Sequence, residues 1–343
     1  MTQAAQLAQY GANNVGLSFK NRIINGDMGI SQRNGTSSVS ITGGGSVAYT
    51  LDRWLAVGLG SGGVFSIQQV AEAPAGFTNS IKATVTTAQA SVNASYTLQQ
   101  PIEGLNISDF GWGTANATAV TLSFWVRSSL TGSFGGSVTN SAFDRTYPFP
   151  YTISAANTWE YKTITIPGDT TGTWLTTNGI GLQLNFCLGA ESAREATANV
   201  WANTIARQPT GSVDLISTLG ATWQVTGVQL EKGTVATSFD YLPYTTELQL
   251  CQRYYETLPI NSAASSVTGT LIYGFVPFAV TKRANPTTTY SGLLTLQGVV
   301  SGLTGITVWD DNTRGNGWGI TRSGTVGTSY LASNAVVNSS AEL

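Results

Sequence analysis

Apolar and polar residues alternate along much of the chain, which is the period of a β-strand with one buried face. The clearest runs cover residues 81–85, 122–126 and 180–188, where every second residue is Ile, Leu, Val, Ala or Phe. Thr, Ser, Gln, Asn and Arg127 occupy the opposite phase, as in antiparallel sheets that face solvent on one side. Gly-rich turns separate the runs and no repeat of fixed period occurs, so we predict an all-β jelly-roll sandwich.

The two ends of the chain depart from this pattern. Residues 1–20 are helix-prone, but so short a helix is marginal in isolation, so we expect an N-terminal attachment segment that orders against another protein. The sandwich is predicted to cover residues 21–256 and to end in a short helix. A Ser-rich stretch at 262–266 is typical of a linker, and residues 257–343 are predicted to form a smaller C-terminal β-domain.

The alternation changes phase near the end of the predicted sandwich. Trp223 and Val225 lie on one phase of a run, whereas Val228 and Leu230 lie on the other. A shift of one residue moves the apolar set to the opposite face unless the strand absorbs an extra residue. We therefore predict a β-bulge at Gly227.

A helix is predicted directly after this strand. Thr246 and Gln249 have the spacing of a capping box. An apolar stripe from Leu248 to Leu258 follows the helical period, and Pro259 would close it.

Composition and charge exclude several functions. Only 10% of the residues are charged, against about 25% in an ordinary domain, and 41% hydrophobic residues argue against disorder. The net charge is −2 without any run of Lys or Arg, so we expect no nucleic-acid binding. The absence of histidine removes Ser-His-Asp and Cys-His catalysis. No apolar run is long enough for membrane insertion, and the N-terminus lacks a secretory signal.

Two cysteines, Cys187 and Cys251, stand in strand-like and helix-like surroundings. Their spacing matches neither a redox motif nor a zinc site. We expect reduced packing residues, while the spacing alone leaves a bridge between them open.

The nine tryptophans are candidates for sugar contact, because a flat ring can stack on the apolar face of a pyranose. Trp112 lies between two glycines and Trp174 follows Thr-Gly-Thr, so we predict that both lie in loops and contact a ligand, with interior packing as the alternative. Trp125 and Trp223 lie in well-patterned strands and are predicted to be core or inter-subunit residues.

A second candidate site is the stretch 309–318, which brings aromatic, acidic, amide and guanidinium groups together. Its members are Trp309, Asp310, Asp311, Asn312, Arg314 and Trp318. A polar hairpin tip is one interpretation, since Asn316-Gly317 is a hairpin signal. The other is a glycan-recognition loop on the distal domain, because binding residues gather on loops held by a rigid scaffold.

Five short stretches together carry a family resemblance. They are residues 21–33, 51–54, 228–256, 276–287 and 341–343, and they contain NRIINGDM, LDRW, EKGTVATSFDYLPYT, KRANPT and AEL. In order and spacing they resemble the β-sandwich domain of phage tail-fibre and other virion appendage proteins, over almost the whole chain.

The resemblance implies a virion structural protein that is assembled in the host cytoplasm and binds host-surface polysaccharide without catalysis. It also implies a homotrimer in which segment 1–20 contacts other virion proteins. A likeness to carbohydrate-binding jelly rolls implies a structural Ca²⁺ held by Asp27 and Glu231, although Met28 stands where those modules often carry an aromatic residue. No other cofactor is implied.

Two alternatives remain at this stage. A polysaccharide depolymerase would use two carboxylates on either side of a sugar bond, but the acidic residues are scattered along the chain. A purely structural collar or decoration protein would bind no glycan at all. The sequence specifies neither the host nor the sugar.

Overall fold

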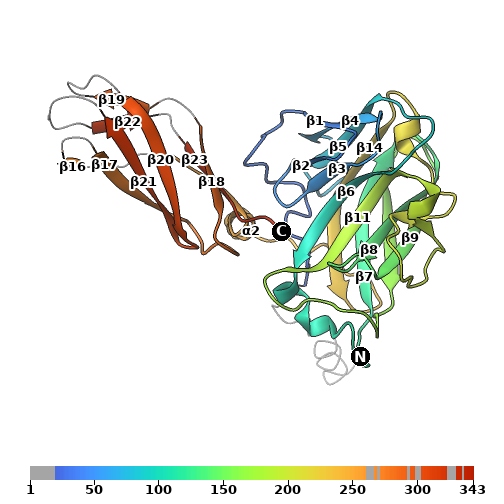
Figure 1. Cartoon of the computed structure of the whole chain (residues 1–343). Helices are drawn as coiled ribbons and strands as arrows, with labels where there is room; N and C mark the ends of the chain where they lie inside the picture. Colours follow the sequence, from blue (N-terminus) through green and yellow to red (C-terminus); the bar gives the residue numbers. More distant parts are fainter. Residues whose placement is uncertain are drawn as a thin grey trace.

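The computed structural model describes residues 20–259, 266–268, 271–291, 294–297, 303–322, 330–333 and 336–343. The strands form two bodies, a large sandwich and a smaller C-terminal β-domain, which are joined through helix α2 (Tyr244–Gln252) (Figure 1). This arrangement confirms the all-β prediction. The predicted attachment segment lies outside the described residues apart from Lys20.

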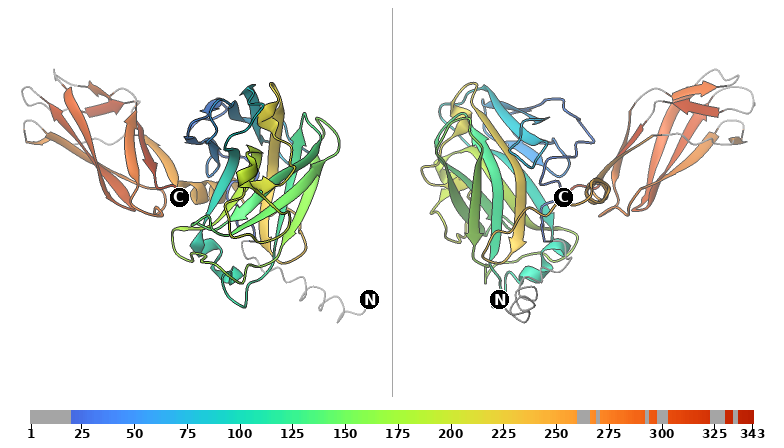
Figure 2. Two further views of the ribbon diagram at one scale, coloured as in Figure 1. Left: turned by 45° about the vertical axis from the view of Figure 1, so that its right-hand side comes forward. Right: turned by 180° about the vertical axis from the view of Figure 1, so that it is seen from behind.

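Two six-stranded antiparallel sheets pack face to face in the sandwich, as the views in Figure 2 show. Sheet A has the order β1-β4-β5-β14-β7-β10 and sheet B the order β2-β3-β6-β11-β8-β9. The strands are β1 (Val39–Thr42), β2 (Ser46–Tyr49), β3 (Leu55–Gly58), β4 (Val64–Val70), β5 (Ser80–Thr87), β6 (Ser95–Glu103), β7 (Val120–Ser128), β8 (Gly132–Thr139), β9 (Thr146–Ile153), β10 (Glu160–Ile166), β11 (Ile180–Ala190) and β14 (Thr222–Lys232).

Short elements connect these strands. Two of them, β12 and β13, form a small parallel pair beside sheet B. They are β12 (Glu195–Ala196) and β13 (Gln208–Pro209), with the 3₁₀-helices η1 (Gly104–Asn106), η2 (Ser108–Phe110), η3 (Ser192–Arg194) and η4 (Leu215–Ser217).

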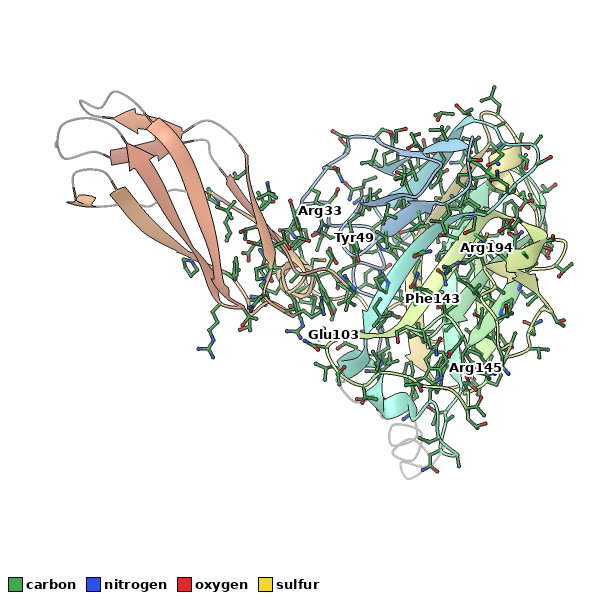
Figure 3. The ribbon with its side chains drawn as sticks, viewed as in Figure 1. Arg33, Tyr49, Glu103, Phe143, Arg145 and Arg194 are labelled. Carbon is green, nitrogen blue, oxygen red and sulfur yellow. The ribbon has the colours of Figure 1, made fainter. Side chains whose placement is uncertain are left out.

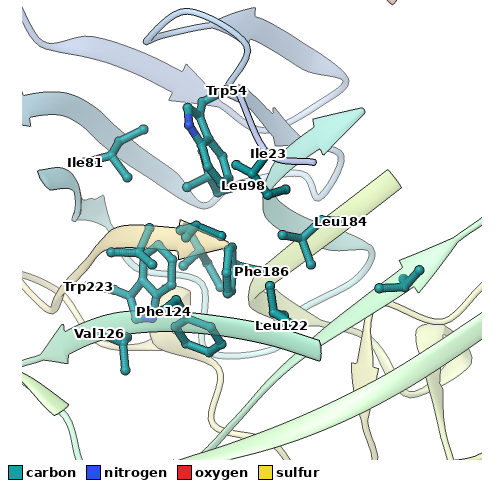
Figure 4. Close-up of a cluster of buried hydrophobic side chains, with 14 of the residues drawn as sticks. Ile23, Trp54, Ile81, Leu98, Leu122, Phe124, Val126, Leu184, Phe186 and Trp223 are labelled. Atoms are coloured by element: carbon teal, nitrogen blue, oxygen red, sulfur yellow. The ribbon is translucent and has the colours of Figure 1, made fainter. Parts of the chain in front are cut away.

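The interior of the sandwich contains the apolar phase that the alternation predicted (Figure 4). Phe124 of β7 meets Phe186 of β11 edge to face with 5.0 Å between the ring centroids, and Trp223 of β14 lies 5.3 Å from Phe186. All three side chains are fully buried. Burying a large apolar side chain stabilises a fold by about 1.5–3 kcal/mol, so this contact between the sheets is a principal source of stability.

The predicted bulge at Gly227 is present. The register of β14 against β7 shifts between Thr226 and Gln229, and Gly227 has a φ of 60°. The extra residue returns Val228 and Leu230 to the core and turns Gln229 to the outer face of sheet A.

The predicted helix is shorter than the sequence pattern suggested. Helix α2 starts after Pro243, so Thr246 lies within its first turn and forms no capping box. The segment Tyr255–Pro259 is strand β15, which pairs with β23 (Val336–Ser340). This pairing gives its backbone groups partners in a sheet, and such tertiary pairing overrides a local helical pattern. The predicted domain boundary at 256/257 therefore falls inside β15.

The C-terminal β-domain consists of one three-stranded sheet, one four-stranded sheet and one two-stranded sheet within the described part of the chain. Its strands besides β15 and β23 are β16 (Ser266–Thr268), β17 (Leu271–Pro277), β18 (Thr287–Ser291), β19 (Leu294–Gln297), β20 (Leu303–Asn312), β21 (Gly315–Arg322) and β22 (Tyr330–Ser333).

Residues from the resembling stretches meet at the junction between the two bodies. The Glu342 carboxylate pairs with Arg53, which is fully buried, and with Arg33 at 3.0 Å. Each guanidinium stacks on a tyrosine ring at 3.6 Å, Arg53 on Tyr254 and Arg33 on Tyr255. Since burying these charges is tolerable only when they are paired, the three residues depend on one another.

The two cysteines agree with the sequence analysis. Both cysteines are free and buried, and burial raises the pKa of the Cys187 thiol to about 12, so it behaves as a packing residue. Among the residues that the structure describes, no helix is long and apolar enough to cross a membrane.

Candidate functional site

A groove of about 260 Å³ lies on the outer face of sheet A. On β7, Leu122, Phe124 and Val126 point into the core, so Ser123 and Trp125 point outward. The groove is lined by Phe77, Ser123, Trp125, Tyr161, Gly227, Ser238, Phe239 and Tyr241.

One side of the groove, the tryptophan wall, consists of Trp125 and Tyr161. These residues are direct partners in the pairing of β7 with β10, and their ring centroids are 5.3 Å apart. Tyr161 is 44% exposed and Trp125 is half-buried, so the wall presents ring surface to solvent. Adjacent strands of a sheet fix this spacing, and the wall is therefore preformed.

The other side, the phenylalanine wall, consists of Phe77, Phe239 and Tyr241. Phe77 comes from the turn between β4 and β5, and the other two follow β14. Their ring centroids are 5.1 Å apart for Phe77 and Phe239 and 4.8 Å apart for Phe239 and Tyr241. The Tyr241 hydroxyl donates a hydrogen bond of 2.7 Å to the carbonyl of Gly76, which ties the two segments together.

The bulge at Gly227 forms part of the floor between the walls. A Cβ atom at this position would lie 2.6 Å from the nearest ring carbon of Phe77. Only glycine combines this close approach with a left-handed backbone. The irregularity that the sequence predicted thus makes room for the phenylalanine wall.

The segment that carries Phe239 is held by polar groups on the outer face of β14. Glu231 accepts hydrogen bonds of 2.8 Å from both the backbone N–H and the hydroxyl of Thr237. The Gln229 side chain donates to Glu231 at 2.9 Å and accepts from the backbone N–H of Asp240 at 2.8 Å. These bonds fix the position of the wall relative to the sheet.

The predicted calcium site at Asp27 and Glu231 is not formed. The Glu231 oxygens already accept hydrogen bonds from Thr237 and Gln229, and Asp27 accepts one from the N–H of Gly29 at 3.1 Å. Over the described ranges of the chain, no group of three or more acidic, cysteine or histidine side chains could hold a metal ion. Calcium needs six to eight oxygen ligands, and this pair does not supply them.

The groove has no charged lining residue, but three carboxylates lie behind the phenylalanine wall. Asp27, Asp240 and Glu247 line a pocket of about 10 Å³ that shares Phe239 with the groove. Burial raises the pKa of Glu247 to about 7, and the charges of Asp27 and Asp240 act in the same direction. The Tyr241 pKa is also raised, by burial and by Asp27.

The prediction that Trp112 and Trp174 contact a ligand is wrong. Their exposed fractions are 6% and 7%, and with Trp201 they form a tryptophan triad packed edge to face. The indole N–H of Trp112 donates to the carbonyl of Thr118 at 2.8 Å, and that of Trp174 donates to Thr171 at 3.2 Å. The loops fold over the rings because each indole N–H finds a backbone acceptor there.

The stretch 309–318 is a hairpin of β20 and β21, as one interpretation predicted, but its turn is at Thr313-Arg314, and Asn316-Gly317 lies within β21. The carbonyls of Thr313 and Arg314 accept hydrogen bonds from Lys282 and Phe278. Lys282 also pairs with Glu256 of β15, so the turn faces the junction between the two bodies (Figure 1). The prediction that this loop lies at the distal end of the domain is therefore wrong.

The side chains of five of the six candidate residues lie outside the described part of the structure: Trp309, Asp310, Asp311, Asn312 and Trp318. Arg314 is described and is exposed. Their role in glycan contact stays a prediction.

Sequence reasoning missed most of the groove. Trp125 stands on the polar phase of its strand, between Ser123 and Arg127, and this phase is a signal of exposure that the sequence does contain. Phe77, Phe239 and Tyr241 lie outside regular strands, so no periodicity could place them.

No family model and no curated protein matches the chain. Among solved structures, the enzymatically active domain of Bacteriophage CBA120 tailspike protein 4 is similar at 11% identity over 62% of this chain, with a TM-score of 0.33. The match covers only 21% of that tailspike chain.

Carbohydrate-binding modules are also similar. A family 4 module matches at 12% identity over 61% of this chain and 98% of its own, with a TM-score of 0.29. A family 61 module in complex with β-1,4-galactotriose matches at 8% identity over 63% of this chain and 100% of its own, with a TM-score of 0.30. What the groove binds is inferred from its own residues.

Proposed function

We propose that this chain is a subunit of a phage tail fibre or similar virion appendage, and that its sandwich binds a host-surface glycan through the aromatic groove without cutting it. The observation that carries glycan binding is the pair of aromatic walls across an uncharged floor. The virion role is supported by the resembling stretches, which meet at the junction of the two bodies.

The chemistry of the groove suits a neutral sugar. Trp125 and Tyr161 offer ring faces on which the C–H groups of a pyranose can stack, and the exposed Ser238 offers a hydroxyl for its oxygens. The volume of about 260 Å³ is just below the roughly 300 Å³ at which small-molecule pockets begin, so it suits one or two rings. The carboxylates behind Phe239 disfavour an anionic sugar.

Binding without catalysis is favoured by the size of the acidic pocket. Glu247 has the raised pKa that a general acid needs, and Asp27 and Asp240 are its carboxylate neighbours. A pocket of about 10 Å³, however, has room for roughly one water molecule and for no sugar ring. Depolymerase activity is the second candidate, because these carboxylates adjoin the groove.

The test of glycan binding uses purified protein and oligosaccharides from host capsule or lipopolysaccharide. Trp125→Ala and Tyr161→Ala should each weaken binding about tenfold, which corresponds to about 1.4 kcal/mol. Tyr244→Ala is the matched control, since Tyr244 is 65% exposed and lies outside the groove. Equal binding by all variants would contradict the groove, and no binding by the wild type across host glycans would favour a structural collar or decoration protein.

Catalysis is tested with the same oligosaccharides. We expect no release of reducing ends from polymer incubated with the protein. Release that Glu247→Gln abolishes would establish the depolymerase alternative, because that variant keeps the shape of the side chain and removes its proton.

The proposed assembly is a homotrimer attached through segment 1–20. Strands β1 and β10 of sheet A and strands β2 and β9 of sheet B are edges, and open edges favour pairing with another chain. Light scattering should give about three times 36.0 kDa. Deleting residues 1–20 should leave a folded protein that no longer joins particles, whereas loss of folding would assign the segment to the core.

A further inference from the structure

The outer face of sheet B differs from that of sheet A in being polar and covered. Gln99 of β6, Gln183 and Asn185 of β11 and Ser137 of β8 are all at most 4% exposed. They bond to one another, for example the Gln183 amide to Asn185 at 3.2 Å and the Asn185 amide to the Ser137 hydroxyl at 3.3 Å. Buried polar side chains require such partners, so this face is a hydrogen-bonding floor.

Arg207 lies on this floor without a counter-charge. It is 5% exposed, and its guanidinium donates one side-chain hydrogen bond, of 3.1 Å, to Asn185. Within the described part of the chain no carboxylate forms an ion pair with it, and its buried Nε has no acceptor. The Phe143 ring lies 5.1 Å from the guanidinium carbon.

The surroundings of Arg207 disfavour its charge on balance. Burial lowers the pKa of Arg207 to about 10; Cys187 acts in the opposite direction, and the nearby charge of Arg194 acts in the same direction as burial. The carboxylates of Glu195 and Asp214 both accept hydrogen bonds from Gln208, at 3.1 and 3.0 Å. A buried charge without a counter-charge is strongly unfavourable. An anion bound beside the Arg207 guanidinium would therefore stabilise it.

Other buried polar atoms on this face also lack partners within the described residues. They are the hydroxyls of Thr139 and Thr146, which face each other between β8 and β9, and the side-chain amide oxygen of Gln208. Figure 3 labels Phe143 and Arg194 over the part of the sandwich that carries β8, β9 and β11. Half-buried Phe143 belongs to the β8–β9 turn and has a φ of 58°, a conformation rare for aromatic residues.

We infer that the outer face of sheet B holds a second site, centred on Arg207, for the carboxylate of an acidic saccharide such as a uronic acid unit. The ligand would enter beside Phe143, and its carboxylate would accept hydrogen bonds from the guanidinium. A guanidinium presents its donors in a planar fork that matches a carboxylate. The saccharide part of this inference rests on the proposed function, whereas the carboxylate part rests on Arg207 alone.

The probes for this site are glucuronate, acetate, inorganic phosphate and glucose, titrated into the wild-type protein with calorimetry. Glucuronate should bind, and glucose should not. If acetate binds as tightly as glucuronate, the site recognises a carboxylate, but the inference that its ligand is a saccharide is overturned. Phosphate binding without glucuronate binding would overturn both.

Variants then locate the site. Arg207→Lys should weaken glucuronate binding at least tenfold, because lysine cannot form the fork. Arg207→Met should abolish binding and leave the melting temperature unchanged or raised, because it removes an unpaired buried charge. A lowered melting temperature for Arg207→Met, in a protein that binds no glucuronate, would make Arg207 structural and overturn the inference.

Two controls separate this site from the groove. Arg127→Met removes a cation from the outer face of sheet A, where Arg127 pairs with Glu72 at 3.0 Å, and should leave glucuronate binding intact. Trp125→Ala should weaken binding of the neutral host oligosaccharide and spare glucuronate. Loss of glucuronate binding in Trp125→Ala would place both ligands in the groove and overturn the second site.

Discussion

The tryptophan triad and the aromatic groove use the same kinds of side chain for different purposes. Trp112 and Trp174 pack edge to face with 4.7 Å between ring centroids, and Trp201 lies 5.4 and 5.5 Å from them. Trp125 and Tyr161 are similarly close, at 5.3 Å, yet their outer surfaces are open. Both regions therefore contain rings in contact with one another. They differ in whether other parts of the chain cover the rings.

The difference lies in the hydrogen bonds and in the strand phase. Every indole N–H of the triad donates to a backbone carbonyl. Trp112 and Trp174 donate within their own loops, and Trp201 donates to Pro167 of another segment at 3.0 Å. Trp125 lies on a strand, where the phase alone points its side chain away from the core. An aromatic residue in a Gly-rich loop is thus no more exposed than one on the polar phase of a strand.

The strongest way to test this contrast is Trp112→Ala. Removing a buried indole leaves a cavity beside Trp174 and Trp201, and we expect the free energy of unfolding to fall by about 3–5 kcal/mol. Urea denaturation of the wild type and the variant gives the difference. Tyr161→Ala, at the rim of the groove, should change the same quantity by less than about 0.5 kcal/mol.

Equal losses in these two variants would remove the distinction between the regions. A small loss for Trp112→Ala together with weakened glycan binding would return Trp112 to the role that the sequence suggested.

The fold was predictable because the signals that define it are local and periodic. Alternation on β7 and β11 identified the buried faces, and the phase change at Gly227 identified the bulge. The segment Tyr255–Pro259 was misassigned to a helix because its partner, β23, is about eighty residues later in the chain. Pairing over that distance leaves no periodic trace in the sequence.

The groove could be predicted only in part. The phase of Trp125 marks it as exposed, and Tyr161 lies on an exposed phase of the edge strand β10. The phenylalanine wall depends on two separate segments that meet through the Tyr241 to Gly76 hydrogen bond and the space at Gly227. Such convergence is set by tertiary packing, which residue spacing does not encode.

A substitution of intermediate effect is Gly227→Ala. The left-handed backbone costs an L-residue about 1–2 kcal/mol, and the new methyl group would displace Phe77 from the wall. We expect lower stability and weaker glycan binding. Gly220→Ala is the matched control, because Gly220 has a φ of 76° and nothing lies within 4 Å of an added Cβ.

Denaturation of both glycine variants measures the cost of backbone strain, and glycan titration measures the effect of displacing Phe77 from the phenylalanine wall. Both should lose stability, and only Gly227→Ala should lose binding. Equal binding by the two variants would show that the position of Phe77 is irrelevant to the groove.

The smallest expected effect is a difference in how the two regions respond to pH. Beside the triad, burial opposes ionisation of Asp169, but hydrogen bonds from Arg145 and Thr171 lower its pKa below the usual 3.8. Its stabilising contribution is therefore present above about pH 3.8 and is lost as the pH falls through the lowered value. Behind the groove, the Glu247 pKa is raised from 4.5 to about 7.

The stability contribution of Glu247 changes with pH in the opposite direction, because the folded protein holds the Glu247 proton more tightly than the unfolded chain does. Its contribution is complete below about pH 4.5 and is lost as the pH rises through about 7. Between about pH 5 and pH 8, Glu247→Gln should therefore gain on the order of 1 kcal/mol relative to the wild type, whereas Asp169→Asn should show a difference that is constant over this range. Urea midpoints measured across that interval decide the matter: a Glu247→Gln difference that stays constant with pH would mean that the carboxylate behind the phenylalanine wall is already ionised at neutral pH.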